Sequence, residues 1–251
     1  MLRVESNGPV LYVTLERPDV RNALDEELIQ DLYETFTTVA EPTRVVVLAG
    51  DGLSFCAGGD LNYMRRVAAY TEEQNYEDAF RLAWVFQSML ECPVPIVAKI
   101  HGATFGGGCG LVAAADVAVA ASDAQFAFSE VRLGLVPATI SPFVIQKIGA
   151  GHARSLFTTG ELFNAERALH IGLIHDMVVH ADLAFAVERR VKAILAAGPK
   201  AVSEAKRIAQ NPPLSLEESA RLLAKIRSTD EAREGVSAFL ERRPARYAVS
   251  P

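Results

Sequence analysis

Apolar runs bounded by glycine, proline and charged residues divide the first half of the chain into alternating strands and helices. β-Branched and apolar runs are typical of buried strands. These runs lie at residues 9–16, 44–50, 95–102, 116–121 and 125–129. Between them, helical spacing predicts one helix that starts from an N-cap at Asp25 and another that starts at Thr71. Strands that alternate with helices predict a layered α/β fold with a largely parallel sheet.

The pattern changes after about Ser141, where strand signals give way to amphipathic helices. Only residues 173–179 still resemble a strand. Four apolar residues of one later helix share a face: Leu216, Ala220, Leu223 and Ala224. We therefore expect an α/β core followed by a helical region that packs on a neighbouring molecule.

The composition indicates a protein with a sizeable core. Half of its 251 residues are apolar, so no disulfide or metal is needed for stability. Cys56, Cys92 and Cys109 are odd in number and lack CxxC spacing, which indicates reduced thiols. No apolar signal segment is found, and the apolar stretch 111–121 is shorter than the ~20 residues of a membrane span. We expect a cytoplasmic protein without membrane contact.

The formal net charge of -6 argues against nucleic acid as the main partner, because the chain has no basic footprint. A small anionic ligand stays compatible with this charge where arginines cluster locally. We expect neither a metal site nor a separate cofactor.

Three consecutive glycines, Gly106 to Gly108, stand directly before an apolar segment. Glycine costs roughly 0.5–1 kcal/mol relative to alanine inside regular structure, so the run needs a reason. Gly108 and Cys109 stand where a phosphate-binding loop needs Lys and Ser/Thr, and Leu111 breaks the GxGxxG dinucleotide pattern. What remains is a strand, a tight turn and a helix whose first N–H groups can hold a ligand oxygen. Close packing of the helix on the strand is the alternative.

A second glycine turn, "SFCAGGDL" (54–61), follows the strand 44–50 and precedes a helix that begins near Asp60. Two such turns, each after a buried parallel strand, can aim two backbone N–H groups at one oxygen. That arrangement is an oxyanion hole, in which the loss of one donor costs roughly 2.7–4 kcal/mol of transition-state stabilisation.

Four segments in register resemble the enoyl-CoA hydratase/isomerase (crotonase) superfamily. They are "FCAGGDL", "KIHGATFGGGCGL", "FSEVRLGLVP" and "EGVSAFLERRP". The likeness runs from "LERPDVRNAL" to the carboxyl end, which is nearly the whole chain. It implies a crotonase spiral β-β-α core over residues 1–195 and a helical region over 196–251 for oligomerisation and for covering the coenzyme. It also implies a homotrimer or dimer of trimers and a place in fatty acid and lipid metabolism.

The resemblance implies that the substrate thioester carbonyl lies between the N–H groups of Gly59 and Gly107. Polarising that carbonyl stabilises an enolate-like state, which permits attack at the β-carbon or proton removal at the α-carbon. Gly107 would then be bare so that the thioester can reach its N–H. A second catalytic glutamate of the family matches Glu130, whose carboxyl we expect in apolar surroundings with a raised pKa. The alternatives for this side chain are solvent exposure or an ion pair with Arg132.

The first catalytic glutamate of the family would fall at position 110, where this chain has Gly110. This departure leaves open hydration by Glu130 alone, hydration with Glu77 or Asp78 as second acid, and isomerisation of a 3-enoyl-CoA. A scaffold that binds CoA esters or RNA without chemistry is a further alternative. "LGLVPATISPFVIQKIG" favours hydration, because it resembles hydratases that act on methylglutaconyl-CoA or carboxygeranoyl-CoA. We therefore expect a hydro-lyase for a 2-enoyl-CoA, with branched or carboxylated chains among the candidates.

The resemblance also implies where coenzyme A lies, along "RPDVRNAL" and the first glycine turn. Six residues are expected to contact it: Val20, Arg21, Ala23, Ala57, Asp60 and Leu61. Because the coenzyme carries several negative charges, arginines are candidates for its phosphates. The candidates are Arg21, Arg65, Arg66, Arg242 and Arg243, and for all but Arg21 we expect an ordinary solvated surface position. Four aromatic residues are candidates for an acyl tunnel or for the core: Phe80, Trp84, Phe105 and Phe143.

Two other reactive side-chain types lie near the turns. His101 ends a strand, and we expect its ring to bond to the backbone and not to act as a base. Cys56 and Cys109 flank the turns, but a thiol nucleophile needs a paired base and none is evident, so we expect both to be packing residues.

Overall fold

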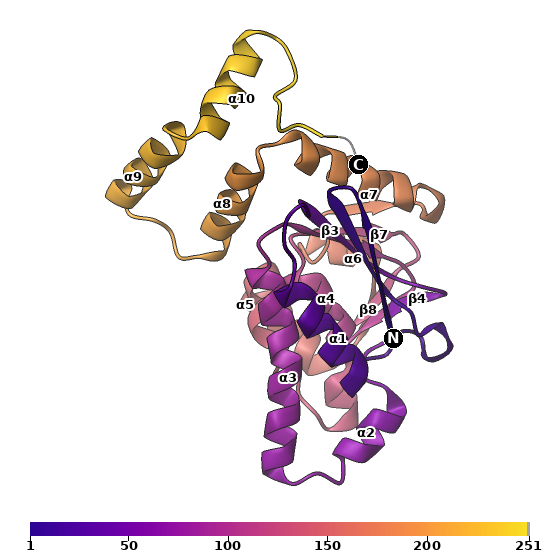
Figure 1. The fold of residues 1–251 in the computed structure, drawn as a ribbon. Helices are drawn as coiled ribbons and strands as arrows, with labels where there is room; N and C mark the ends of the chain where they lie inside the picture. Colours follow the sequence, from indigo (N-terminus) through magenta and orange to yellow (C-terminus); the bar gives the residue numbers. More distant parts are fainter. Residues whose placement is uncertain (250–251) are drawn as a thin grey trace.

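A computed structural model of the chain describes residues 1–249 (Figure 1). Its strands form a six-stranded sheet in the order β1-β2-β3-β5-β7-β10 and a four-stranded sheet in the order β4-β6-β8-β9. In chain order the strands are β1 (Leu2–Asn7), β2 (Val10–Leu15), β3 (Val45–Gly50), β4 (Ser54–Cys56), β5 (Ile96–Ile100), β6 (Ala103–Phe105), β7 (Val117–Ala121), β8 (Gln125–Ala127), β9 (Leu162–Asn164) and β10 (Asp176–Val178).

The helices follow the strands in a repeating order. They are α1 (Glu26–Thr37), α2 (Leu61–Val67), α3 (Glu72–Glu91), α4 (Gly107–Ala114), α5 (Ser141–Thr159), α6 (Ala165–His170), α7 (Leu183–Ala196), α8 (Pro199–Gln210), α9 (Leu216–Arg227) and α10 (Asp230–Leu240). Three short 3-10 helices are η1 (Pro18–Val20), η2 (Ser129–Leu133) and η3 (His180–Asp182).

Three successive strand pairs, β3/β4, β5/β6 and β7/β8, place their first strand in the large sheet and their second in the small sheet. Within each sheet these strands pair in parallel. Each pair leads into helical segments, namely α2 and α3, α4, and α5. The result is a spiral of β-β-α turns, as the resemblance to the crotonase family implies. The two glycine turns begin where β4 and β6 end in the small sheet.

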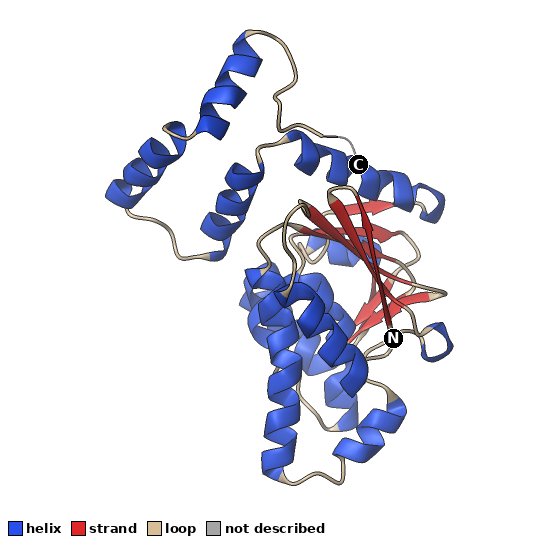
Figure 2. Cartoon of the chain, viewed as in Figure 1, coloured by secondary structure: helices blue, strands red, loops and turns tan. Residues whose placement is uncertain are grey.

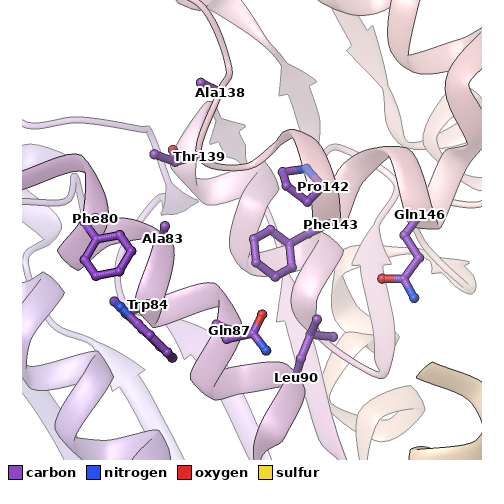
Figure 3. Close-up of a pocket in the computed structure, with 10 residues that line it drawn as sticks. All are labelled: Phe80, Ala83, Trp84, Gln87, Leu90, Ala138, Thr139, Pro142, Phe143 and Gln146. Carbon is purple, nitrogen blue, oxygen red and sulfur yellow. The ribbon is translucent and has the colours of Figure 1, made fainter. Parts of the chain in front are cut away.

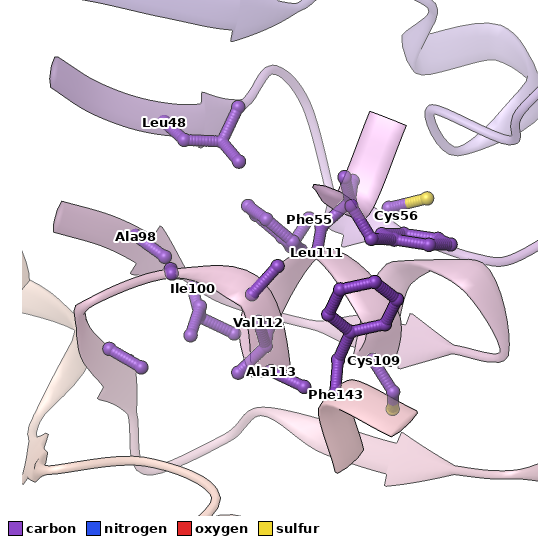
Figure 4. Close-up of a cluster of buried hydrophobic side chains, with 14 of the residues drawn as sticks. Leu48, Phe55, Cys56, Ala98, Ile100, Cys109, Leu111, Val112, Ala113 and Phe143 are labelled. Carbon is purple, nitrogen blue, oxygen red and sulfur yellow. The ribbon is translucent and has the colours of Figure 1, made fainter. Parts of the chain in front are cut away.

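Helices cover both faces of the large sheet (Figure 2). On one face, α7 packs Leu183, Val187 and Val191 against a valine-rich surface of the sheet. The other face meets α1, α3, α4 and α5 in the main core. Residues 108–114 of α4 are all buried, and Figure 4 shows its side chains enclosed by those of β3, β4 and β5. A helix that is apolar on every side has to be surrounded by protein.

The predicted helix starts are confirmed by their caps. The Asp25 carboxylate accepts a hydrogen bond from the backbone N–H of Leu28 and begins α1. Thr71 and Gln74 form a reciprocal capping box that begins α3. The helix expected near Asp60 begins there as α2, because the Asp60 carboxylate binds the first free N–H groups.

The pattern of the sequence does not predict β1, β4, β6 or β9. Three of these strands have only three residues, which is too short for an alternating pattern to be detected. β1 is longer, but five of its six residues are exposed because it forms the outer edge of the large sheet. Tertiary pairing, and not local pattern, defines all four.

Helices α8 to α10 form an arm beside the core (Figure 1). The Lys206 ammonium on α8 attaches this arm to the core, at 2.9 Å from the Asp116 carboxylate and 3.2 Å from the Val94 carbonyl oxygen. Leu216 and Phe239 of the arm are largely exposed. The roles predicted for residues 196–251 in oligomerisation and in covering the coenzyme stay predictions. Within residues 1–249, no helix combines the length and apolarity that crossing a membrane requires.

Asn22 anchors the segment 17–24 to the turn between β3 and β4. It is fully buried and has a left-handed backbone, with φ of 56°. Its side-chain NH₂ donates to the carbonyl oxygens of Asp51 and Ser54, each at 2.8 Å, and its amide oxygen accepts from Arg17 N at 2.8 Å. Each polar atom of the side chain is therefore satisfied by backbone.

We expect Asn22→Asp to lower the free energy of unfolding by about 3 kcal/mol, because a carboxylate oxygen would face two buried carbonyls without a donor. Denaturant titration followed by circular dichroism measures the loss. The matched control is Asn7→Asp, at an exposed position beside the β1–β2 turn, which should change stability by less than about 0.5 kcal/mol. Equal unfolding midpoints for the two variants would contradict the anchoring role.

Candidate active site

The first glycine turn leaves one backbone N–H free. Leu24 N donates to Gly58 O at 2.7 Å, and Asp60 N donates to Leu24 O at 2.9 Å. The segment around Leu24 thereby holds both neighbours of Gly59 in a short parallel bridge. Among residues 1–249 no acceptor pairs with the Gly59 N–H. Gly58 has a φ of 97°, a conformation that favours glycine, so the sharp turn depends on it.

The second glycine turn leaves a free N–H at the start of α4. Gly106 N donates to Ala127 O at 2.9 Å, and its φ of 48° turns the chain into the helix. Gly107 is the first residue of α4, so its N–H has no partner inside the helix, and none is found elsewhere in residues 1–249. The positive end of the α4 dipole lies behind this donor.

The absence of a side chain at Gly107 has a second reason besides the predicted approach of a thioester. A Cβ at this position would lie 2.6 Å from Leu24 Cδ1, which is closer than van der Waals contact allows. A side chain here would therefore have to displace the buried Leu24 side chain, whether or not a ligand approaches.

The two turns and Glu130 meet at one place. A Cβ on Gly106 would lie 3.2 Å from Glu130 Oε1 and 4.0 Å from Gly58 Cα. A Cβ on Gly58 would in turn lie 3.3 Å from the carbonyl oxygen of Phe105, at the end of β6. The carboxyl therefore lies beside the turn that carries Gly107 and close to the turn that carries Gly59.

The Glu130 carboxyl is partly desolvated, and one of its two oxygens has no partner. It lies in η2, directly after β8, and its Oε2 is buried with no hydrogen-bond partner among residues 1–249. Burial raises the pKa of Glu130 above its ordinary value, and a backbone N–H opposes this only in part. The alternative ion pair with Arg132 is not formed, because the Arg132 guanidinium donates to Gly160 O at 2.8 Å. A raised pKa makes this carboxyl a stronger base than a solvated glutamate, which favours a role in proton transfer.

Apolar side chains fill the space next to Gly110. A Cβ there would lie 2.5 Å from Ile140 Cγ2 and 2.8 Å from Phe86 Cε1 and Cζ. Phe143 packs on Phe86, with ring centroids 5.5 Å apart, and supports this wall. The chain therefore differs from a two-acid site in two ways. It lacks the first glutamate, and the side chains of Ile140 and Phe86 occupy the space that a side chain at position 110 would need.

The two alternative second acids occupy different environments. Glu77 is exposed on α3. Asp78 is buried, where its carboxylate accepts a hydrogen bond from the Tyr63 hydroxyl and lies 3.4 Å from the Arg81 guanidinium. Asp78 thus joins α2 to α3, and its carboxylate already has two partners.

A cavity of about 480 Å³ opens beside the first glycine turn. The six residues predicted to contact coenzyme A all line it: Val20, Arg21, Ala23, Ala57, Asp60 and Leu61. Gly59 and Phe105 also line it, so the cavity reaches the free N–H of the turn. Phe105 therefore lines the cavity predicted for coenzyme A. The three other aromatic candidates for the acyl tunnel, Phe80, Trp84 and Phe143, do not line it.

Asp60 lines this cavity, but its carboxylate is already engaged. It accepts hydrogen bonds from Asn62 N at 2.8 Å and Tyr63 N at 3.1 Å, and lies 3.1 Å from the Arg17 guanidinium. The Tyr63 N–H and Arg17 lower the pKa of Asp60. Arg17 also pairs with Asp25 at 2.7 Å, so it joins the start of α1 to the start of α2.

The arginines differ in their freedom to bind phosphate. Arg66 pairs with Glu26 at 2.5 Å, and Arg243 with Glu234 at 2.7 Å. Arg65 lines the cavity and donates to the Asn62 side chain. The guanidinium groups of two others have no hydrogen-bond or ion-pair partner among residues 1–249: Arg21, which lines the cavity, and Arg242, in the arm.

A second cavity, of about 540 Å³ and almost wholly apolar, lies between α3 and the start of α5 (Figure 3). Phe80 and Trp84 line it from α3, and Phe143 lines it from α5. Phe143 also packs on Phe86, so the inner wall of this cavity is continuous with the wall that closes position 110.

The remaining candidates are structural, as expected. His101 Nε2 lies 2.9 Å from the carbonyl oxygen of Gly52. Cys56, Cys92 and Cys109 are free and buried, and burial raises the pKa of Cys56 to about 12. In the described part of the chain, no three His, Cys, Asp or Glu side chains are grouped to hold a metal ion.

Comparisons with known proteins agree with this architecture. The family model described as "Enoyl-CoA hydratase/isomerase" matches residues 5–249. A crotonyl-CoA hydratase from Syntrophomonas wolfei is 30% identical, over 98% of this chain and 96% of that protein. Among solved structures, an enoyl-CoA hydratase from Shewanella pealeana is 35% identical with a TM-score of 0.91, over 98% of this chain and 95% of that one. AtuE from Pseudomonas aeruginosa is 33% identical with a TM-score of 0.94, over 99% of both chains. The chain therefore belongs to the enoyl-CoA hydratase/isomerase (crotonase) family.

Proposed function

We propose that this protein is an enoyl-CoA hydratase that adds water across the double bond of a 2-enoyl-CoA. The observation that carries this proposal is the partly desolvated Glu130 carboxyl, whose buried Oε2 has no partner, beside the turn that presents the free Gly107 N–H. The resemblance of the whole chain to named hydratases supports it.

The proposed reaction uses the N–H groups of Gly59 and Gly107 to bind the thioester oxygen. Glu130 as a carboxylate takes a proton from water while the water oxygen bonds to the β-carbon. The double-bond electrons move toward the thioester, and the negative charge forms on the oxygen held by the two N–H groups. Glu130 then delivers the proton to the α-carbon, which gives a 3-hydroxyacyl-CoA and restores the carboxylate.

Isomerisation of a 3-enoyl-CoA to a 2-enoyl-CoA is the second candidate, and one observation favours it. The wall at Gly110 has no room for a second acid, and Glu130 alone is sufficient to move a proton from the α-carbon to the γ-carbon. The same two N–H groups would stabilise the dienolate that forms between the two transfers.

We place coenzyme A in the cavity lined by Arg21, whose free guanidinium suits a phosphate. The acyl chain would occupy the apolar cavity between α3 and α5, and branched or carboxylated chains are the proposed substrates. We further propose a cytoplasmic homotrimer or dimer of trimers in fatty acid and lipid metabolism, with the arm of one copy packed on another.

The deciding experiment is a panel of straight, branched and carboxylated 2-enoyl-CoAs, together with 3-enoyl-CoAs, incubated in deuterated water. Hydration adds the mass of one water and removes the absorbance of the conjugated thioester. Isomerisation of a 3-enoyl-CoA adds no water and creates the absorbance of the conjugated thioester. Tight binding of acyl-CoA with no turnover on any member of the panel would refute both proposals.

We expect Glu130→Gln to lower turnover by about 10²- to 10⁴-fold, because it removes the one group proposed to move the proton. The loss is measured on the best substrate of the panel, with circular dichroism to verify folding. Glu77→Gln, at an exposed position on α3, is the matched control and should retain wild-type activity. A folded Glu130→Gln variant with wild-type turnover would exclude the mechanism.

The same substitution should stabilise the protein at neutral pH. The folded-state pKa of Glu130 lies above the ordinary value, so stability that is present below about pH 4.5 is lost as the pH rises through the raised pKa. Glutamine carries no charge and escapes this loss. We therefore expect Glu130→Gln to have a higher free energy of unfolding than wild type at neutral pH, with the difference shrinking toward acid. Denaturant titrations across this pH range measure the effect, and Glu77→Gln should follow the wild type throughout.

Gly110→Glu should not create a two-acid hydratase. The new side chain would collide with Phe86 and Ile140 and bury a charge, so we expect a loss of at least about 3 kcal/mol in stability without a gain in turnover. Gly151→Glu on α5, where a Cβ would meet nothing within 4 Å, is the control and should fold normally. A stable Gly110→Glu enzyme with raised turnover would contradict this prediction, because it would show that Phe86 and Ile140 can move aside.

A further inference from the structure

A lysine ammonium binds the end of α4 that is opposite to Gly107. Lys147, on α5, places its Nζ 2.5 Å from the carbonyl oxygen of Ala115 and 3.3 Å from that of Val112. These carbonyls belong to the last turn and the C-cap of α4, where the helix has no further N–H groups to bind them. A cation at this end also interacts favourably with the helix dipole.

Lys147 forms no ion pair with the nearby carboxylate of Asp116. Its nearest acidic neighbour, Asp116, is already paired with the Lys206 ammonium at 2.9 Å and accepts the Ile96 N–H at 2.8 Å. His175 also lies near, with its Nδ1 occupied by the N–H of Ala118. Burial lowers the pKa of Lys147 to about 8, which Asp116 opposes only in part. Lys147 therefore makes its two hydrogen bonds to the helix carbonyls at a cost in desolvation.

The same helix α5 touches α4 at a second place. Ile140, at the start of α5, fills the space beside Gly110 in the first turn of α4, whereas Lys147 binds the last turn. Helix α4 has only eight residues and is buried along residues 108–114. Its orientation, and with it the direction of the Gly107 N–H, is therefore set by contacts at its two ends.

We propose that Lys147 is a positioning residue for the oxyanion hole: its ammonium holds the carboxyl-terminal turn of α4 so that the Gly107 N–H points at the thioester oxygen. The eight residues of α4 span about 12 Å, so the cation lies farther than this from that oxygen. In the interior its positive potential also favours the negative charge that forms there. This inference rests on the proposed function of Gly107.

The test reads the polarisation of a bound thioester directly. 4-(Dimethylamino)cinnamoyl-CoA absorbs at longer wavelength when its carbonyl is polarised, so its red shift on binding reports on the two N–H groups. Lys147→Gln keeps a donor and removes the charge, and we expect a smaller red shift and a kcat lowered about fivefold with KM little changed. Lys147→Arg keeps the charge, so its red shift and its kcat should lie closer to the wild-type values than those of Lys147→Gln.

Lys206→Gln is the matched control, because Lys206 is the neighbouring lysine that binds carbonyls at the end of α3 and not those of α4. It should lower the unfolding midpoint and leave the red shift unchanged. If Lys147→Gln gives the wild-type red shift and kcat, or if Lys206→Gln lowers both equally, the positioning role is refuted. A wild-type protein that neither shifts the probe nor turns over any enoyl-CoA would instead refute the proposed function.

A second measurement covers the case in which Lys147→Gln does not fold. The red shift is followed in wild type and in Lys147→Arg from about pH 7 to about pH 10, where lysine loses its proton and arginine does not. The charged and titratable groups that face Lys147, namely Asp116, His175 and Lys206, are common to both proteins. The red shift should decrease in wild type and persist in Lys147→Arg. A parallel decrease in both would overturn the proposal.

Discussion

The site depends on the direct packing of one backbone turn against another. A Cβ on Gly108 would lie 2.3 Å from the carbonyl oxygen of Cys56, so only glycine allows α4 to begin this close to the end of β4. The parallel pairing of β4 with β6 fixes the two turns relative to each other before any ligand arrives. The two free N–H groups therefore belong to a rigid framework, which is the condition for stabilising charge without reorganisation.

Several unfavourable local features are held in place by this framework. Asn22 adopts a left-handed backbone, and Oε2 of the Glu130 carboxyl is buried without a partner. Each is balanced by neighbours that are fully satisfied: the Asn22 amide binds three backbone atoms, and Arg17 joins two helix caps. Unfavourable groups gathered beside two free donors are typical of a site where stability is given up for chemistry.

Local pattern predicts the strands β2, β3, β5 and β7 and the helix starts at Asp25 and near Asp60, and the four motifs in register identify the family. The reasons behind individual residues were not accessible in the same way. That Leu24 fills the space at Gly107, and that Phe86 and Ile140 fill the space at Gly110, are contacts between segments 24 to 83 residues apart. No periodicity in the chain encodes such contacts, because they arise only when the spiral brings the strands and helices together. For the same reason the sequence does not predict that the Asp60 carboxylate, at the predicted coenzyme site, is engaged with α2 and Arg17.

The closed wall at Gly110 and the raised pKa of Glu130 are connected, because both bear on how one acid can serve the site. In a site with two acids, one carboxyl can serve as the base while the other, with a raised pKa, serves as the acid, so each group has a single role. Where Glu130 acts alone, the same carboxyl has to take a proton from one atom and return it to another in each turnover. That exchange is fastest when the two protonation states are close in free energy, which an ordinary solvated glutamate does not offer near neutral pH. Burial moves Glu130 toward this balance, so the desolvation that costs stability is what a one-acid site requires.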